Sequence, residues 1–195
     1  LTTLLSPGDI IVDGGNSNFR DSIRRGEALT RKGFRFMDAG TSGGVWGLKF
    51  GYSLMVGGDK SAFAVLEPAL KTLAPKDGYL HCGPVGSGHY VKMIHNGIEY
   101  GMMQSFAEGF ELLKKGPFEI DLPAVSELWE HGSVVRSWLL ELATLALKKD
   151  PKLEHVKPWV SDSGEGRWTL HECIDYEVPA PTIAAALFAR FASRD

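Results

Sequence analysis

The chain has 195 residues, of which 44% are hydrophobic and 23% charged, and its formal net charge is −3. This composition is typical of a globular protein and gives no reason to expect nucleic acid or an anionic membrane surface as a partner. No apolar run approaches the ~20 residues of a transmembrane helix, and the start has no signal-peptide pattern. Cys82 and Cys173 form no Cys-x-x-Cys motif, so we expect reduced thiols in a cytoplasmic protein.

The first part of the chain alternates predicted strands and helices. Strands are expected at Asp9–Asp13, Phe34–Asp38, Tyr52–Val56 and Gly78–Cys82, and helices from Ser17 or Asn18 to Lys32 and over Lys60–Leu73. This rhythm predicts one edge of a doubly wound, Rossmann-like sheet. The sequence lacks an initial methionine and opens on a buried-looking strand. We therefore expect a fragment that has lost the beginning of this domain.

After Gly88 the pattern predicts helices only. They are expected over Ser87–Lys115, Leu122–His131 with Asp121 as N-cap, Val135–Lys149, a segment after Gly164–Gly166, and from Pro181 to near the C-terminus. The shift in composition places a domain boundary near residue 86. The expected fold is α/β over residues 1–86, followed by an all-helical domain over residues 87–195.

A polar stripe stands out in the first of these helices. It consists of Lys92, His95, Asn96 and Glu99, at offsets of 0, 3, 4 and 7. These offsets place the four side chains on one face of a helix whose other positions are mostly apolar. The stripe could be a solvated face or contain a satisfied core histidine. We interpret it as the wall of a cleft, in which a desolvated lysine serves as a base and a buried glutamate as an acid.

Three further features have both a functional and a simple structural interpretation. Asp13–Ser17 follows a strand and opens a helix, so it is either a ligand-binding loop or a turn with an asparagine cap. Thr41–Gly44 is either an anion-binding nest or a flexible turn. Arg167 and Arg190 are each next to an aromatic residue in the sequence. They are either surface or packing arginines, or the two members of a clamp that binds a phosphate group. The sequence contains no Walker loop, no Gly-x-Gly-x-x-Gly turn between a strand and a helix, and no paired histidine spacing for a metal.

The segment His95–Gly101, with the sequence His-Asn-Gly-Ile-Glu-Tyr-Gly, resembles the 6-phosphogluconate dehydrogenase family. Other segments resemble that family in the expected order: Ile11–Ser17, Ser42–Gly44, Ser53–Gly58, Gly166–Thr169 and Phe188–Arg190. The wider β-hydroxyacid dehydrogenase superfamily shares the Ser-Gly-Gly loop, the Met-Val-Gly-Gly strand and a catalytic lysine. The resemblance therefore extends over nearly the whole chain.

This resemblance implies oxidative decarboxylation of 6-phosphogluconate to ribulose 5-phosphate in the pentose phosphate pathway, with NADP or NAD as cofactor. It makes Lys92 the base and then the proton donor to oxygen, and Glu99 the acid that protonates C1. The sugar acid would be bound by Asn16, Ser42, Gly43, Gly44, His95 and Asn96, and the phosphate by Tyr100, Arg167 and Arg190. Asn16 would also contact the cofactor. A homodimer or tetramer would form through the helical domain.

The chain departs from the family pattern in three respects. Arg167 stands where many long members have lysine, which preserves the charge but changes its geometry. The helical domain has the length of the short bacterial form. The family's N-terminal dinucleotide-binding turn and its C-terminal tail are expected to be missing. Two alternatives remain open: a relative that oxidises another β-hydroxyacid, and an inactive fragment that serves only as a dimerisation module.

Overall fold

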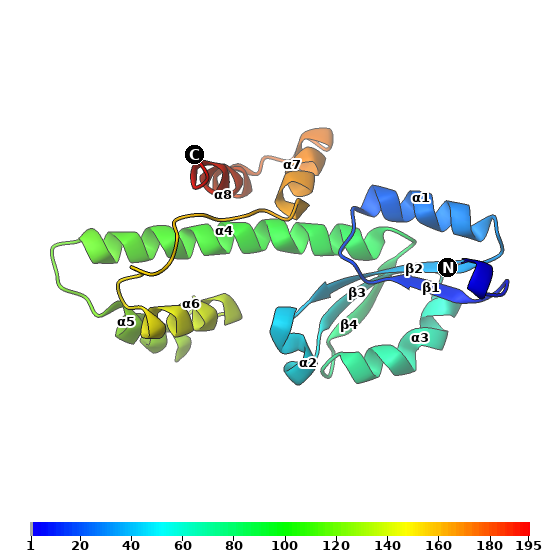
Figure 1. The fold of residues 1–195 in the computed structure, drawn as a ribbon, viewed down its shortest axis with the longest axis horizontal. Coiled ribbons are helices and arrows are strands. Elements are labelled where there is room, and N and C mark those ends of the chain that lie inside the picture. Colours follow the sequence, from blue (N-terminus) through cyan, green and yellow to red (C-terminus); the bar gives the residue numbers. More distant parts are fainter. Residues whose placement is uncertain (1) are drawn as a thin grey trace. The chain divides into compact units, whose positions relative to one another are not determined.

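The computed structural model describes residues 2–195 and divides into two compact units, Leu1–Asn96 and Gly97–Asp195. The first unit is a four-stranded sheet with helices against it (Figure 1). After a short 3-10 turn, η1 (Thr2–Leu4), its strands are β1 (Ile10–Asp13), β2 (Arg35–Ser42), β3 (Ser53–Gly58) and β4 (Tyr79–Gly83), hydrogen-bonded in that order. Its first two long helices, α1 (Phe19–Thr30) and α3 (Lys60–Leu73), lie on opposite sides of the sheet.

The sheet is mixed, which corrects the expectation of a plain doubly wound edge. β1 pairs with β2 and β3 with β4 in parallel, but β2 and β3 are antiparallel. Only η2 (Gly44–Trp46), the single-turn α2 (Gly47–Phe50) and a few flanking residues connect β2 to β3. A parallel crossover needs about a dozen residues or more. This connection is too short for one, so β3 turns back along β2.

Strand β2 is longer than predicted. Its predicted end was Asp38, but the strand continues to Ser42, because Ala39 to Ser42 pair with Val56 to Ser53 of β3. Thr41 and Ser42 therefore belong to the strand and not to a flexible turn. Only Gly43 and Gly44 leave it, with φ angles of +135° and +50° that favour glycine.

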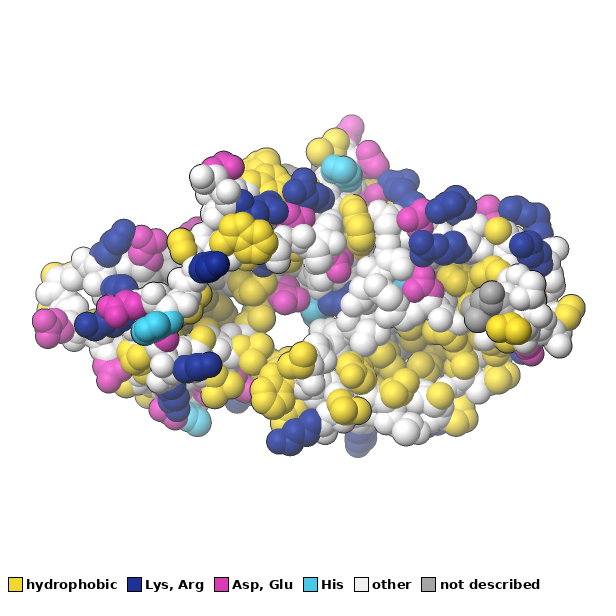
Figure 2. All heavy atoms as spheres, viewed as in Figure 1, with side chains coloured by type: hydrophobic (Ala, Val, Ile, Leu, Met, Phe, Trp, Pro, Cys, Tyr) yellow, Lys and Arg dark blue, Asp and Glu magenta, His cyan; other side chains and the backbone are white. Residues whose placement is uncertain are grey.

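The helices of the first unit begin where side chains cap them. Asn18 accepts a hydrogen bond from the backbone N–H of Arg20 at the start of α1, and Asp59 accepts from Ser61 and Ala62 at the start of α3. The core lies between the sheet and α3 and consists of Met37, Ala39, Leu54, Val56, Ala62 and Leu70. The η2–α2 segment instead exposes Val45, Leu48 and Phe50, and hydrophobic side chains over α2 are visible in Figure 2.

Helix α4 (Ser87–Lys115) has the predicted bounds, and its first turns belong to the sheet unit. A Cβ atom on Gly88 would lie 2.4 Å from the carbonyl oxygen of Met55 and 2.6 Å from that of Asp38. Glycine therefore lets the backbone of α4 lie directly against β2 and β3. For this reason the compact unit continues to Asn96, ten residues beyond the boundary expected from composition.

The second unit contains the rest of α4 and four further helices. They are α5 (Leu122–Glu130), α6 (Trp138–Lys149), α7 (Glu165–Asp175) and α8 (Pro181–Ala192). Asp121 caps α5 as predicted, whereas α6 begins three residues later than expected because Ser137 is its N-cap. One buried cluster of this unit comprises Tyr100, Ala186 and Leu187, and Leu122, Leu140 and Leu147 of α5 and α6 are also buried. None of the helices within residues 2–195 is long and apolar enough to cross a membrane.

Candidate active site

Asn16 joins the end of β1 to the end of β2. Its Nδ2 donates a hydrogen bond to the carbonyl oxygen of Thr41 (3.0 Å), and the N–H of Thr41 donates to Oδ1 (2.7 Å). The residue has a φ angle of +51°, which asparagine adopts more readily than most residues. The side-chain amide thus pairs with the backbone N–H and carbonyl oxygen of Thr41, as the backbone of a neighbouring strand would. One N–H and one lone pair remain beyond these two bonds, so Asn16 can still contact a ligand.

Lys92 is the centre of a hydrogen-bonded group formed by α4 and β2. Its side chain is buried, and Nζ donates to Oδ1 of Asn96 and lies 3.3 Å from Nδ1 of His95. On the other side of the ring, Nε2 of His95 lies 3.3 Å from Oγ of Ser42. The structure therefore brings together four residues that were predicted to act in one site. An amide and an imidazole hold Nζ in one place, as a proton-transfer group requires.

Gly40 makes room for the stem of Lys92. A Cβ atom at this position would lie 2.4 Å from the Cβ of Lys92 and 2.7 Å from the carbonyl oxygen of Gly88. The glycine therefore allows the lysine to extend along the strand. We did not assign Gly40 from the sequence, although a glycine inside a strand is a known sign of close backbone approach.

Glu99 follows Lys92 by seven residues in the same helix, α4, and is half-buried. It lies in the second unit together with the predicted phosphate-binding residues. Tyr100 of α4 is buried, and the guanidinium of Arg190 stacks 3.5 Å from its ring centroid. Arg190 also donates to the carbonyl oxygen of Ser161 (2.6 Å). The ring that this guanidinium contacts is that of Tyr100, which is distant from Arg190 in the sequence.

A single carboxylate, Asp162, organises two further arginines. Arg167 donates to it through Nε (2.8 Å) and Nη2 (3.1 Å), and Nη2 of Arg194 lies 3.1 Å from it. The hydrogen bond from Arg167 is the largest of the influences that lower the pKa of Asp162. Two guanidinium groups thus bind one carboxylate, and Arg190 binds the carbonyl oxygen of the neighbouring Ser161, so positive side chains outnumber Asp162 here. Arg194 was missed from the sequence, because no motif distinguishes it from a surface arginine near a chain end.

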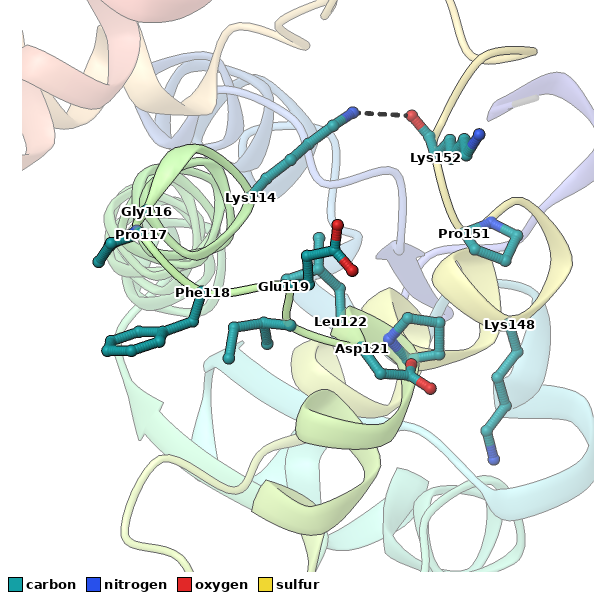
Figure 3. A pocket seen from close by; sticks show the side chains of 12 residues that line it. Lys114, Gly116, Pro117, Phe118, Glu119, Asp121, Leu122, Lys148, Pro151 and Lys152 are labelled. Atoms are coloured by element: carbon teal, nitrogen blue, oxygen red, sulfur yellow. Dashed lines mark hydrogen bonds between the residues drawn. The ribbon is translucent and has the colours of Figure 1, made fainter.

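A cavity of about 670 Å³ lies at the other end of α4 (Figure 3). Its lining includes Lys114, Leu122 and Lys148, and Lys114 donates to the carbonyl oxygen of Lys152 (3.1 Å). None of the predicted site residues lines this cavity.

His89 connects α4 to α1 in the interior of the sheet unit. It is 1% exposed, and its Nδ1 lies 2.7 Å from Oγ of Ser22. Burial lowers its pKa below the ordinary histidine value, and attraction to Asp38 and Asp13 opposes this only in part. Nε2 is buried as well, which also favours the neutral ring.

We predict that the sheet unit loses stability as the pH falls below about 6.5. The unfolded chain then binds a proton at His89 that the native ring does not accept, so the equilibrium shifts toward unfolding. The free energy of unfolding should therefore fall as the pH decreases through the ordinary histidine range. Urea titrations followed by NMR signals of β2 would measure this. His89→Asn should remove this part of the pH dependence, and an unchanged dependence in that variant would contradict the assignment.

Comparison with known proteins gives the family of the chain. Residues 1–83 match the model of the NAD binding domain of 6-phosphogluconate dehydrogenase, and residues 88–195 match that of its C-terminal domain. The NAD(+)-dependent, decarboxylating 6-phosphogluconate dehydrogenase of Haloferax volcanii is 46% identical over 192 residues, covering 97% of this chain and 63% of that protein. The decarboxylating enzyme of Lactococcus lactis subsp. lactis is 39% identical over 207 residues, covering 99% and 44%.

Among solved structures, the 6-phosphogluconate dehydrogenase of Plasmodium falciparum matches with a TM-score of 0.89 and 34% identity. The match covers 98% of this chain and 44% of that one, and the protein was solved alone, with NADP+ and with 6-phosphogluconate. The chain thus spans less than two thirds of the length of these relatives. These matches confirm the expected fold class and the resemblance noted in the sequence. The chain belongs to the 6-phosphogluconate dehydrogenase family.

Proposed function

We propose that the protein containing this chain oxidises and decarboxylates 6-phosphogluconate, forming ribulose 5-phosphate and carbon dioxide with reduction of NAD or NADP. The observation that carries this proposal is the buried Lys92, whose Nζ is held by Asn96 and His95 beside Ser42. Such a group can accept a hydroxyl proton and return it without leaving its place. Membership of the family supplies the class of substrate.

Lys92 acts first as a base. In its neutral form it takes the proton of the C3 hydroxyl as C3 loses a hydride, which leaves a ketone at C3. The ketone lies β to the C1 carboxylate, so the C1–C2 bond can break with its electron pair moving toward the ketone oxygen. Carbon dioxide leaves, and Lys92 gives its proton to that oxygen to form an enediol. An ammonium beside the oxygen stabilises the negative charge that develops there.

Glu99 completes the sequence as an acid. It donates a proton to C1 of the enediol, while the remaining hydroxyl proton returns to Lys92 and the carbonyl of ribulose 5-phosphate forms. The C1 that receives the proton is the former C2 of the substrate. Two groups are needed, because one proton goes to carbon and the other leaves oxygen. Lys92 and Glu99 on one helix supply these two groups.

The remaining predicted residues bind the two charged ends of the substrate. We assign the sugar acid to Asn16, Ser42, Gly43, Gly44, His95 and Asn96, and the phosphate to Tyr100, Arg167 and Arg190. The excess positive charge around Asp162 supports the phosphate assignment, since guanidinium groups bind phosphate through paired hydrogen bonds. Ser42 lies within hydrogen-bond distance of His95, which supports their common assignment.

The residues after β1 fit a nicotinamide cofactor. A Cβ atom on Gly14 would meet no heavy atom within 4 Å, so space for a ligand exists beside this loop. Asn16 keeps one donor and one acceptor position there. When bound, NAD or NADP supplies the acceptor for the hydride. We assign Asn16 as the residue of this chain that contacts its nicotinamide.

A steady-state assay of the full-length gene product tests this function. We expect turnover of 6-phosphogluconate with NAD or NADP and release of carbon dioxide in equal amount to the reduced cofactor. Turnover of an unphosphorylated β-hydroxyacid, with none of 6-phosphogluconate, would support the alternative substrate class instead. Reduced cofactor without carbon dioxide would contradict the decarboxylation step.

We also propose that the helical unit mediates a homodimer and that the protein works in the cytoplasm. Its surface exposes large apolar side chains, including Leu145, Ile174, Tyr176 and Phe188. Burial against a second copy would remove these groups from water. The two free thiols are compatible with a reducing compartment. Light scattering that gave a monomer at high concentration would contradict the dimer.

A further inference from the structure

We propose that Asp38 is a positioning residue for Lys92. Asp38 fixes the first turn of α4 against β2 and thereby determines where the lysine lies. This inference rests on the proposed function, because it concerns the residue to which we assign the proton transfer.

The carboxylate of Asp38 caps a helix that begins far away in the sequence. Asp38 is fully buried in β2, its Oδ1 accepts from the N–H of Gly86 (2.6 Å), and its Oδ2 accepts from the N–H of His89 (2.7 Å). Both oxygens therefore bind backbone donors at the start of α4. A negative charge is also favourable at this end of a helix, because the free N–H groups there carry partial positive charge.

Three alternate residues of β2 contact three successive turns of α4. Asp38, Gly40 and Ser42 are two residues apart, so they face the same side of the strand. The first binds the start of the helix, the second lies against the Cβ of Lys92, and the third is hydrogen-bonded to His95. Lys92 thus lies between two fixed contacts, and loss of the Asp38 contact would let this part of α4 move on the strand.

The surroundings of Asp38 fit the shape of a carboxylate closely. A Cβ atom on Gly57 would lie 2.5 Å from Oδ1 of Asp38, and one on Gly88 would lie 2.6 Å from its carbonyl oxygen. Both glycines therefore pack directly against Asp38. Asparagine has the right shape, but it has one acceptor oxygen for two N–H donors, and its own NH₂ would face the second of them.

The test compares Asp38→Asn with Asp59→Asn in the full-length gene product. Asp59 is a matched control, because its carboxylate also accepts from two backbone N–H groups at a helix start, yet α3 carries none of the assigned site residues. We expect Asp38→Asn to lower kcat, corrected for the folded fraction, by about tenfold or more. Asp59→Asn should keep kcat within about twofold and change the melting temperature little, because both N–H groups bind Oδ1, which asparagine retains, and asparagine caps helices about as well as aspartate.

An unchanged kcat in Asp38→Asn would overturn the proposal, as would an equal loss in both variants. If Asp38→Asn fails to fold, Asp38→Ser provides the second variant, since serine is smaller and keeps one acceptor oxygen. A normal kcat in Asp38→Ser would also overturn the proposal. If the wild-type protein does not turn over 6-phosphogluconate, the proposed function fails separately. The NMR signals of the Lys92 and His95 side chains then decide: they should shift in Asp38→Asn and not in Asp59→Asn, and unshifted signals in both would overturn the positioning role.

Discussion

Lys92→Met should lower kcat for 6-phosphogluconate by roughly 10²–10⁴-fold, the range expected for loss of a general base. Methionine matches the apolar stem that lies against Gly40, but it has no atom that can accept the C3 hydroxyl proton. The fold should therefore persist, while hydride loss from C3 becomes very slow. Single-turnover formation of reduced cofactor in the full-length gene product would measure this step directly.

The matched control is Lys114→Met. Lys114 lies on the same helix, is exposed, and donates to the carbonyl oxygen of Lys152. We expect this variant to keep wild-type kcat and KM. Near-normal turnover by Lys92→Met would remove Lys92 as the base, whereas equal losses in the two variants would indicate a general effect on the helix.

Gly88→Ala should destabilise the sheet unit by about 3 kcal/mol or more, at or above the upper end of the range for overpacked interiors. The added Cβ would lie within 2.8 Å of three backbone atoms, which belong to Met55, Asp38 and Gly57. Backbone atoms cannot move aside by a change of rotamer, so α4 must separate from β2 and β3. Urea unfolding followed by residue-resolved signals of β2 would give the change in free energy.

Gly109→Ala is the matched control on the same helix. A Cβ atom at Gly109 would meet no heavy atom within 4 Å. Alanine should therefore stabilise α4 locally by about 0.5–1 kcal/mol, because it restricts the unfolded chain more than glycine does. Equal effects of the two substitutions would show that helix propensity, and not the contact with the sheet, dominates at Gly88.

Local signals in the sequence were sufficient for most helices. The Asp121 cap predicted the start of α5, and α3 and α4 have the predicted bounds. What could not be predicted depends on distant partners. The extension of β2 to Ser42 exists because β3 pairs with it in antiparallel orientation, and no residue near Ser42 signals that pairing.

In the candidate site, too, contacts between residues close in the sequence were predictable and contacts between distant residues were not. Helical spacing alone placed Lys92, His95 and Asn96 on one face, and the hydrogen bonds among them agree with this. Ser42 was singled out from the sequence as part of a possible anion-binding loop, but its contact with His95 was not predicted. Asp38 was missed because its partners, Gly86 and His89, are about fifty residues away in the sequence. A cap of this kind follows from tertiary packing and leaves no local pattern.

The pairing of Asp162 with Arg167 and Arg194 has a consequence for selectivity among anions. Long side chains lose conformational freedom when they bind a ligand, at a cost of up to about 2 kcal/mol each. Here the fold has already ordered two of them around a carboxylate. Binding becomes an exchange in which the incoming group competes with Asp162. A singly charged anion has little advantage over a resident carboxylate, so we expect the cluster to prefer doubly charged groups such as phosphate esters.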